Sequence, residues 1–164
     1  MAIMCNNDIA NNLKIKDIFG GMKQNAQLFE KVVCANFKDI QADHALVHDD
    51  DEIKKLIKSN TMYTVFAYDG NILVGYLIGE IINNNSCFHI GYLYVISSHR
   101  CHGIASILMH TMNDKMKNSH GINKITLTCN INNAHNFNFY TKKGFSIDKL
   151  YMKTNNYCVM STKL

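Results

Sequence analysis

The sequence has no proline, no tryptophan and no Cys-x-x-Cys pair among its 164 residues. Its cysteines have no regular spacing, which argues against a disulfide framework and favours reduced, mostly buried thiols. We expect no metal site, because His99, Cys101 and His102 are near neighbours in the chain and would need a second group of ligands elsewhere. The six cysteines are Cys5, Cys34, Cys87, Cys101, Cys129 and Cys158.

Long apolar runs and clusters of basic residues are also missing. Residues 1–12 lack the basic segment and apolar core of a signal peptide, and no apolar run reaches the length that spans a bilayer. The 17 Lys and Arg residues exceed the 13 acidic residues by only four, and they are spread along the chain instead of being clustered as in nucleic-acid-binding proteins. We therefore expect a soluble, cytoplasmic protein that binds neither membranes nor nucleic acid.

The composition indicates one folded domain. Hydrophobic residues make up 47% of the chain and charged residues 18%, a balance typical of globular proteins. A chain of this length can bury a core without metal or disulfide links. No linker, repeat or low-complexity segment interrupts it, so we expect residues 1–164 to form a single domain.

The periodicity of the apolar residues predicts a mixed α/β order. Spacings of three and four predict helices over 22–37, from about 49, from 104 to about 120, and over 133–142. Alternation predicts strands at 13–18, 62–68, 72–82, 87–96 and 124–130, with two more between 145 and 164. Asp69 and Gly70 supply the tight turn of a hairpin between the second and third strands.

One loop carries the strongest functional signal. Residues 100–105 read R-x-x-G-x-A, and they lie between a predicted strand and a helix with a regular apolar face. Such a junction directs backbone N–H groups and the positive end of a helix dipole at one point, which favours a phosphate or pyrophosphate group. The sequence contains neither the Gly-Lys-Ser/Thr of a P-loop nor the three glycines of a dinucleotide-binding loop.

The loop does not stand alone. A strand, Asn133 and the sequence Phe139-Tyr140-x-x-Gly144-Phe145 follow it, and the whole resembles the GNAT superfamily of acyl-CoA-dependent N-acetyltransferases, most strongly over 61–145. The resemblance implies an α/β (α+β) fold with a central mixed, mostly antiparallel sheet of six to seven strands, flanked by about four helices. It also implies acetyl-CoA as co-substrate, and we expect a monomer or a homodimer.

The resemblance identifies a set of candidate cofactor-binding residues. The loop would hold the pyrophosphate of acetyl-CoA through backbone N–H groups, and the end of the preceding strand would lie beside the pantetheine arm. Asn133 and Asn136 belong to the family pattern N-x-x-A-x-x-F-Y, with Asn136 where alanine is usual. The full set is Leu93, Tyr94, Val95, Arg100, Cys101, His102, Gly103, Ile104, Ala105, Ser106, Asn133 and Asn136.

The chemistry requires an oxyanion contact and an acid. An amine attacks the thioester carbonyl, so the site must stabilise an oxyanion and protonate the departing thiolate. The resemblance assigns the first task to a backbone N–H near Val95 and the second to Tyr140.

The amine must also lose a proton, and two residues are candidates for the base. Protein-lysine members of the family often have a glutamate eleven residues before the loop arginine, and His89 is at that position here. A neutral imidazole suits the task. Alternation along the strand places His89 on the side of Leu93 and Val95, unless a bulge reverses it. Glu80, on the preceding predicted strand, is the alternative base, acting through a water molecule.

The sequence leaves two classes of acceptor amine open. The closing segment, 149–161, resembles the hairpin that covers the incoming N-terminus in peptide-acting members, so we expect a peptide or protein N-terminus or a lysine. A polyamine or another small amine is the alternative, with the acidic run 49–52 as its cation site. Tyr92 stands where spermidine/spermine acetyltransferases have glutamate, which weighs against polyamines. A second alternative is a non-catalytic acyl-CoA-binding domain, which would keep the loop but should lose the acid Tyr140.

Overall fold

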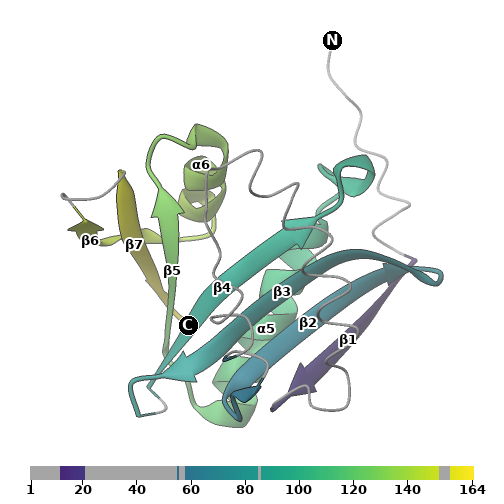
Figure 1. Cartoon of the computed structure of the whole chain (residues 1–164), viewed down its shortest axis with the longest axis horizontal. Helices are drawn as coiled ribbons and strands as arrows, with labels where there is room; N and C mark the ends of the chain where they lie inside the picture. The colour runs from purple at the N-terminus through teal and green to yellow at the C-terminus, as the bar shows by residue number, and fades with distance from the viewer. Residues whose placement is uncertain (1–11, 21–54, 56–57, 85, 152–155) are drawn as a thin grey trace. The chain divides into compact units, whose positions relative to one another are not determined.

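The computed structural model describes residues 12–20, 55, 58–84, 86–151 and 156–164. Contacts divide the chain into two compact units, residues 1–18 with 63–164, and residues 19–62. The first unit contains nearly all of the described elements. They include a seven-stranded sheet in the order β1-β2-β3-β4-β5-β7-β6 (Figure 1), which confirms the predicted mixed sheet.

Three consecutive strands form an antiparallel meander. They are β2 (Met62–Asp69), β3 (Ile72–Ile82) and β4 (Cys87–Val95), and β1 (Leu13–Phe19) lies at the edge beside β2. Gly70 takes φ +58° in the turn between β2 and β3, as the Asp-Gly sequence predicts. The turn between β3 and β4 contains Asn83 and Asn84, both at φ +53°, a conformation that asparagine tolerates better than most residues.

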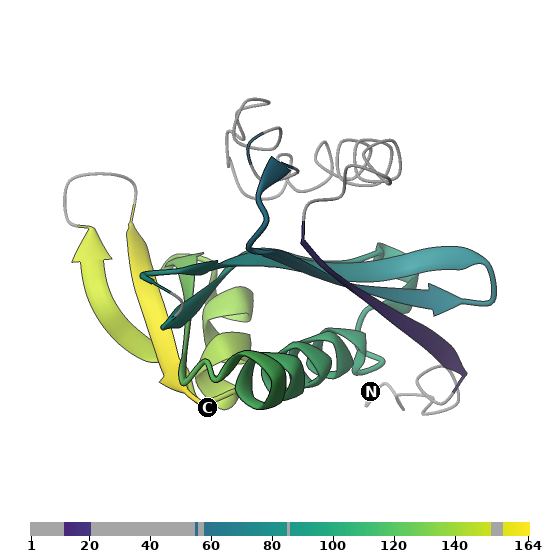
Figure 2. The ribbon, with the colours of Figure 1, turned by 90° about the horizontal axis from the view of Figure 1, so that it is seen from below.

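A helical crossover connects β4 to β5 (Lys124–Asn130), which lies parallel to it. The crossover contains the short 3-10 helix η2 (Ser97–His99) and the helix α5 (Ile104–His120). Gly103 and Gly121 flank α5 in the left-handed conformation, with φ +80° and +65°. The helix packs on β3 and β4 (Figure 2), because its apolar residues recur along one face.

The last third of the chain adds one helix and two strands. The helix α6 (Ala134–Lys142) begins at its N-cap Asn133, and β6 (Ser146–Tyr151) and β7 (Tyr157–Lys163) form an antiparallel pair. Strand β7 lies between β5 and β6 and pairs antiparallel with both. Gly144 takes φ +86° just beyond α6, where a left-handed residue ends a helix.

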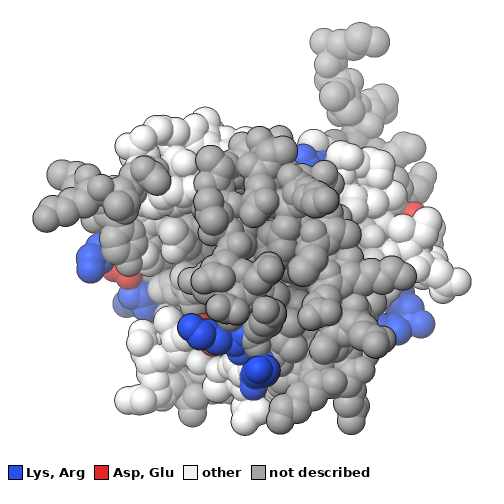
Figure 3. Space-filling model, viewed as in Figure 1, with Lys and Arg blue, Asp and Glu red and all other residues white. Residues whose placement is uncertain are grey.

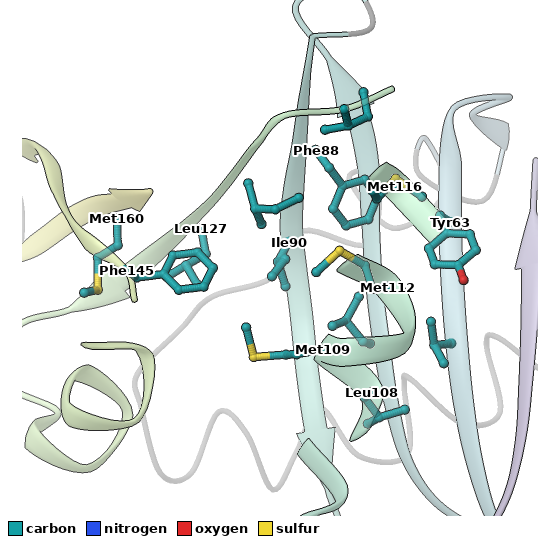
Figure 4. Packing of buried hydrophobic residues seen from close by; sticks show 14 of the residues in the cluster. Tyr63, Phe88, Ile90, Leu108, Met109, Met112, Met116, Leu127, Phe145 and Met160 are labelled. Atoms are coloured by element: carbon teal, nitrogen blue, oxygen red, sulfur yellow. The ribbon is translucent and has the colours of Figure 1, made fainter. Parts of the chain in front are cut away.

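One apolar core lies between the sheet and the two helices. Leu108, Met109, Met112 and Met116 of α5 pack there, and Figure 4 shows them beside residues from β2, β4, β5 and β7. Phe137, Phe139 and Tyr140 of α6 pack against the same core. The labelled partners in Figure 4 are Tyr63, Phe88, Ile90, Leu127, Phe145 and Met160.

Two of the four predicted helices are described. Residues 104–120 and 134–142 are helical as expected, whereas the predicted helix at 22–37 and most of the one that begins near 49 lie outside the described residues. Within the described part of the chain, no helix combines the length and the apolar character needed to cross a membrane.

Candidate functional site

Strands β4 and β5 pair over only part of their length. Four residues of β4, Cys87–Ile90, pair with Lys124–Leu127 of β5, and the pairing stops there. Beyond this point the two strands diverge toward their carboxyl ends (Figure 1). In an open sheet with parallel strands, ligands bind where the carboxyl ends of neighbouring strands separate, so this part of the sheet is the first candidate site.

A bulge in β4 marks the place where the strands part. Ile90 pairs with Gly79 of β3 and Tyr92 pairs with Ile78, so Gly91 is an extra residue in β4. Such a bulge turns the rest of the strand onto the opposite face. Leu93 consequently packs toward the core, whereas Tyr94 lies on the other face against Tyr76, with 5.6 Å between ring centroids.

The predicted phosphate loop follows directly after β4. Cys101 and Gly103 take positive φ angles of 64° and 80°, and α5 begins at the next residue. In the described part of the chain, no side chain caps the amino end of α5, and its first turn contains no acidic residue. An added Cβ at Gly103 would meet no atom within 4 Å, so the space beside that backbone is open. These features fit an anion bound by backbone N–H groups.

Several contacts hold this loop against the sheet. The Ile96 N–H donates to the Val74 carbonyl at 3.0 Å. His99 Nε2 lies 3.3 Å from Asp69 Oδ2 at the end of β2, and His99 Nδ1 lies 2.8 Å from Ser98 Oγ. The loop is therefore attached both to β3 and to the β2–β3 turn.

Arg100 points back toward the strand that precedes it. Its Nε donates to the Val95 carbonyl at 2.9 Å, and its guanidinium carbon lies 5.8 Å from the centre of the Tyr94 ring. This arrangement places a fixed positive charge at the end of β4, beside the loop. On the face in Figure 3, the described Lys and Arg residues form separate small groups.

The other predicted loop residues have distinct positions. Cys101 is exposed and His102 is half-buried, and the Nδ1 atom of His102 is buried and has no hydrogen-bond partner among the described residues. Ile104 belongs to the core, so only its backbone is placed to contact a ligand. Ala105 and Ser106 lie in the first turn of α5.

The two candidate bases lie side by side. Glu80 of β3 and His89 of β4 are partners in the antiparallel register, so their side chains share a face. The expected placement of His89 with Leu93 and Val95 is wrong, because the extra residue Gly91 stands between them and reverses the alternation. Burial lowers the pKa of His89, so its imidazole is neutral at neutral pH.

A hydrogen bond fixes one side of the His89 ring. Its Nδ1 atom lies 3.0 Å from the hydroxyl oxygen of Thr126, which is its register partner on β5. The same hydroxyl lies 3.5 Å from Cys87 Sγ. Sequence reasoning missed both Thr126 and Cys87, because the pairing of β4 with β5 joins residues that are far apart in the chain.

Tyr140 lies on the core side of α6, where β5 has separated from β4. Its ring contacts Phe139 and Phe145, with centroid distances of 5.3 and 5.8 Å. Burial, and then the nearby Cys129 thiol, raise the pKa of Tyr140 well above its ordinary value. The phenol therefore keeps its proton at neutral pH, as a proton donor must.

Asn133 has a structural task at the start of α6. Its side-chain oxygen accepts a hydrogen bond from the Asn136 N–H at 3.1 Å, which is the usual bond of an N-cap. The sequence predicted Asn133 as the first residue of this helix, and an asparagine at that place is a signal for an N-cap. The residues predicted for the phosphate loop therefore lie directly after β4, and those predicted from Asn133 onward lie in a capped helix after β5.

Comparisons with known proteins agree with this arrangement. Residues 27–145 match the profile of the Acetyltransferase (GNAT) family, and no curated protein sequence matches the chain. The fold is similar to that of Ard1 from Thermoplasma volcanium, with a TM-score of 0.73 and 17% identity over 93% of this chain and 98% of that one.

Two further solved structures are similar over a comparable length. PaiA N-acetyltransferase from Thermoplasma acidophilum, in complex with coenzyme A, has a TM-score of 0.65 and 19% identity over 92% of this chain and 99% of that one. Arabidopsis thaliana Naa50, in complex with the bisubstrate analogue CoA-Ac-MVNAL, has a TM-score of 0.65 and 20% identity over 93% and 99%. The structures agree in fold and the family profile covers well over half of the sequence, so the chain belongs to the acetyltransferase (GNAT) family.

Proposed function

We propose that the protein transfers the acetyl group of acetyl-CoA to the amine of a peptide or protein, at its N-terminus or at a lysine. The observation that carries this proposal is the separation of β4 and β5 beyond Ile90 and Leu127, with an uncapped helix amino end on one side and Tyr140 on the other. The family supports acetyl-CoA as co-substrate. Its match begins at residue 27, so we also propose that both contact units belong to one domain.

The residues divide the reaction between them. The loop at 100–106 binds the pyrophosphate through backbone N–H groups, and the last residues of β4, Leu93–Val95, lie along the pantetheine arm. Asn133 and Asn136 shape the other side of the cofactor site through the amino end of α6. A backbone N–H near Val95 stabilises the oxyanion, because a fixed dipole needs no reorganisation as charge develops.

Proton transfer completes the reaction. His89 takes a proton from the ammonium group of the acceptor, and the resulting amine attacks the thioester carbonyl. Tyr140 then donates its proton to the departing thiolate, which leaves as coenzyme A. The acetylated nitrogen, which still carries one proton more than an amide, releases that proton to solvent, as does the imidazolium of His89, and the tyrosinate regains a proton from solvent. Glu80 is the alternative base through a water molecule, since it is the register partner of His89.

The acceptor class rests on the similar structures and on the closing strands. Naa50 was solved with an analogue that joins CoA to the peptide MVNAL, and the β6–β7 hairpin at the end of the chain corresponds to the segment expected to cover a peptide. The polyamine alternative relies on the acidic run at 49–52, which lies outside the described residues. We therefore favour a peptide acceptor.

The test is an assay of coenzyme A release with acetyl-CoA and four sets of acceptors: short peptides with free N-termini, peptides blocked at the N-terminus that contain lysine, polyamines, and aminoglycosides. The proposal predicts turnover with one of the peptide sets and mass spectrometry that shows one added acetyl group. Turnover with polyamines alone would replace the proposed acceptor class. Acetyl-CoA binding without turnover of any amine would favour the non-catalytic alternative.

A further inference from the structure

A hydrogen-bonded network of three side chains, His89, Thr126 and Cys87, lies in the paired part of β4 and β5. His89 Nδ1 lies 3.0 Å from Thr126 Oγ1, Thr126 Oγ1 lies 3.5 Å from Cys87 Sγ, and Cys87 Sγ lies 3.7 Å from the carbonyl oxygen of Phe88. Cys87 and Thr126 are only 4% and 8% exposed. Water therefore has little access to the middle of this network, and each group depends on the others for hydrogen bonds.

The carbonyl oxygen of Phe88, at the end of this network, determines which atom donates in each hydrogen bond. A carbonyl oxygen only accepts hydrogen bonds, so the single hydrogen of the Cys87 thiol donates to Phe88. The sulfur then accepts from the Thr126 hydroxyl, whose only hydrogen is thereby used. The Thr126 oxygen in turn accepts from His89, which requires the proton of the neutral imidazole to be on Nδ1. The other nitrogen, Nε2, then has its lone pair available.

With the proton on Nδ1, Nε2 is the ring nitrogen of His89 that can accept a proton from a substrate. Among the described residues, His89 has a hydrogen bond only through Nδ1. Its ring is half-buried on the face shared with Glu80, its register partner on β3. Among the described residues, the charged register partners of this network are Glu80, opposite His89, and Lys124, opposite Cys87, and Lys124 is paired with Asp148 at 2.6 Å. A base at this position must present an unprotonated nitrogen to the acceptor amine.

We infer that Thr126 and Cys87 are positioning residues that hold His89 in the Nδ1–H tautomer, with Nε2 directed toward the acceptor amine. This inference rests on the proposed function, because it assigns His89 as the base of that reaction. It also favours His89 over Glu80, since Glu80 has no comparable group that fixes its protonation and orientation among the described residues. Thr126 and Cys87 contact neither substrate nor cofactor and act only through the imidazole.

The first experiment observes the tautomer and needs no substrate. Long-range ¹H–¹⁵N correlation spectra of the full-length ¹⁵N-labelled protein distinguish protonated from unprotonated ring nitrogens, and the His89→Gln variant identifies the His89 signals. At a pH where His89 is neutral, we expect the proton on Nδ1 in the native protein. In Thr126→Val, which removes the hydroxyl and keeps the shape, we expect a shift toward Nε2–H. A native proton on Nε2 would overturn the inference.

The second experiment measures turnover of the best peptide from the acceptor panel. Thr126→Val should lower kcat about five- to tenfold, the effect of one lost hydrogen bond, with KM for acetyl-CoA unchanged. Thr126→Ser keeps the hydroxyl and should stay within about twofold of the native kcat. In a His89→Ala background, Thr126→Val should change kcat less than about twofold, because the two residues act as a unit.

Cys87→Ala gives an independent test if Thr126→Val fails to fold, which thermal denaturation will reveal. Without the thiol, the Thr126 hydroxyl is released to donate toward His89, so the tautomer should again shift toward Nε2–H, whereas Cys87→Ser should retain Nδ1–H. Unchanged tautomers in both Thr126→Val and Cys87→Ala would overturn the inference. If no amine is acetylated, the proposed function fails while the spectra still decide the tautomer, so the two failures are distinguishable.

Discussion

The β4–β5 pair has a lower part, in which the two strands are hydrogen-bonded to each other, and an upper part toward their carboxyl ends, in which they are not. In the lower part, residues 87–90 and 124–127 are hydrogen-bonded partners, and Phe88, Ile90, Ile125 and Leu127 are buried. In the upper part, residues 91–95 do not pair with residues 128–130, and the strands lead into the loop at 100–106 and α6. One pair of strands thus contributes stability at one end and the candidate site at the other.

This difference shows how the fold separates the two requirements. Buried, paired residues tolerate little change, because the interior is closely packed. Residues of β4 beyond Ile90 remain paired with β3 but no longer pair with β5, so a ligand can take the place of that strand. Substitutions in the upper part should therefore reduce activity and spare stability, whereas substitutions in the lower part should reduce stability first.

The largest effect is expected at Tyr140 of α6, the helix that follows the upper part of β5. Tyr140→Phe should lower kcat about 1,000-fold, within the range for loss of a general acid, because the departing thiolate then lacks its proton donor. Isothermal titration calorimetry should show unchanged acetyl-CoA affinity. Tyr63→Phe is the matched control, since it removes a hydroxyl that donates to Asp17 at 3.1 Å in another part of the sheet; kcat should stay near native. Retained turnover in Tyr140→Phe would remove its role.

His89 lies in the lower part but on the face opposite α5, and its effect should be next in size. His89→Ala should lower kcat about 100-fold. Burial lowers the pKa of His89, so kcat/KM of the native protein should fall with acidification only below the ordinary histidine pKa, as the base gains a proton. The facing groups are Glu80, Cys87 and Thr126.

A pH–rate profile with the preferred acceptor measures this acid limb. His89→Ala should abolish it, whereas Glu80→Gln should retain it. If neither substitution changes the profile, proton removal belongs to solvent or to another group, and the base assignment fails.

The packing of the lower part is best tested from Gly79 of β3, which lies against it. An added Cβ there would be 2.5 Å from Cζ of Phe88 and would also meet the His89 carbonyl, so Gly79→Ala should lower the free energy of unfolding by about 2–3 kcal/mol. Gly91→Ala is the control, because its Cβ would be 3.7 Å from the Ile78 carbonyl; its loss should be below about 1 kcal/mol. Urea denaturation measures both, and equal losses would contradict the proposed division between the two parts.

The smallest effect is expected from loosening the phosphate loop. Asp69→Asn weakens the contact with His99, a partly exposed pair worth about 0.5–1 kcal/mol. KM for acetyl-CoA should rise about threefold with kcat unchanged. Asp114→Asn removes the partner of His110 on α5, at 3.2 Å, and should leave KM unchanged. A rise in KM for both variants would indicate a general effect of charge instead of loop positioning.

Local sequence patterns were sufficient for most of the fold. Alternation predicted β5 as 124–130, and the glycines around α5 predicted both its ends, because these features depend on neighbours in the chain. The loop at 100–105 was recognisable for the same reason. Asn133 was predicted to begin a helix, and it does so as an N-cap.

Features that depend on strand register were not predictable. Simple alternation along β4 placed His89 on the wrong face, and the structure has the bulge that was named as the condition reversing it. Counting residues could not decide whether the bulge was present, although a glycine within a strand is a signal for one. Thr126 had no signal at all, since its contact with His89 exists only once β5 lies beside β4. The site residues that sequence reasoning missed are therefore those joined by the parallel pairing.

The four-residue pairing of β4 with β5 also has a mechanical meaning. It joins the strands β1–β4, against which α5 packs most closely, to the strands β5–β7, against which α6 packs. Each side has its own helix, so the angle between the two sides is set at this short seam. Amide hydrogen exchange at residues 87–90 and 124–127 therefore reports the cooperativity between the two sides, and a ligand that bridges the diverging strands should slow it.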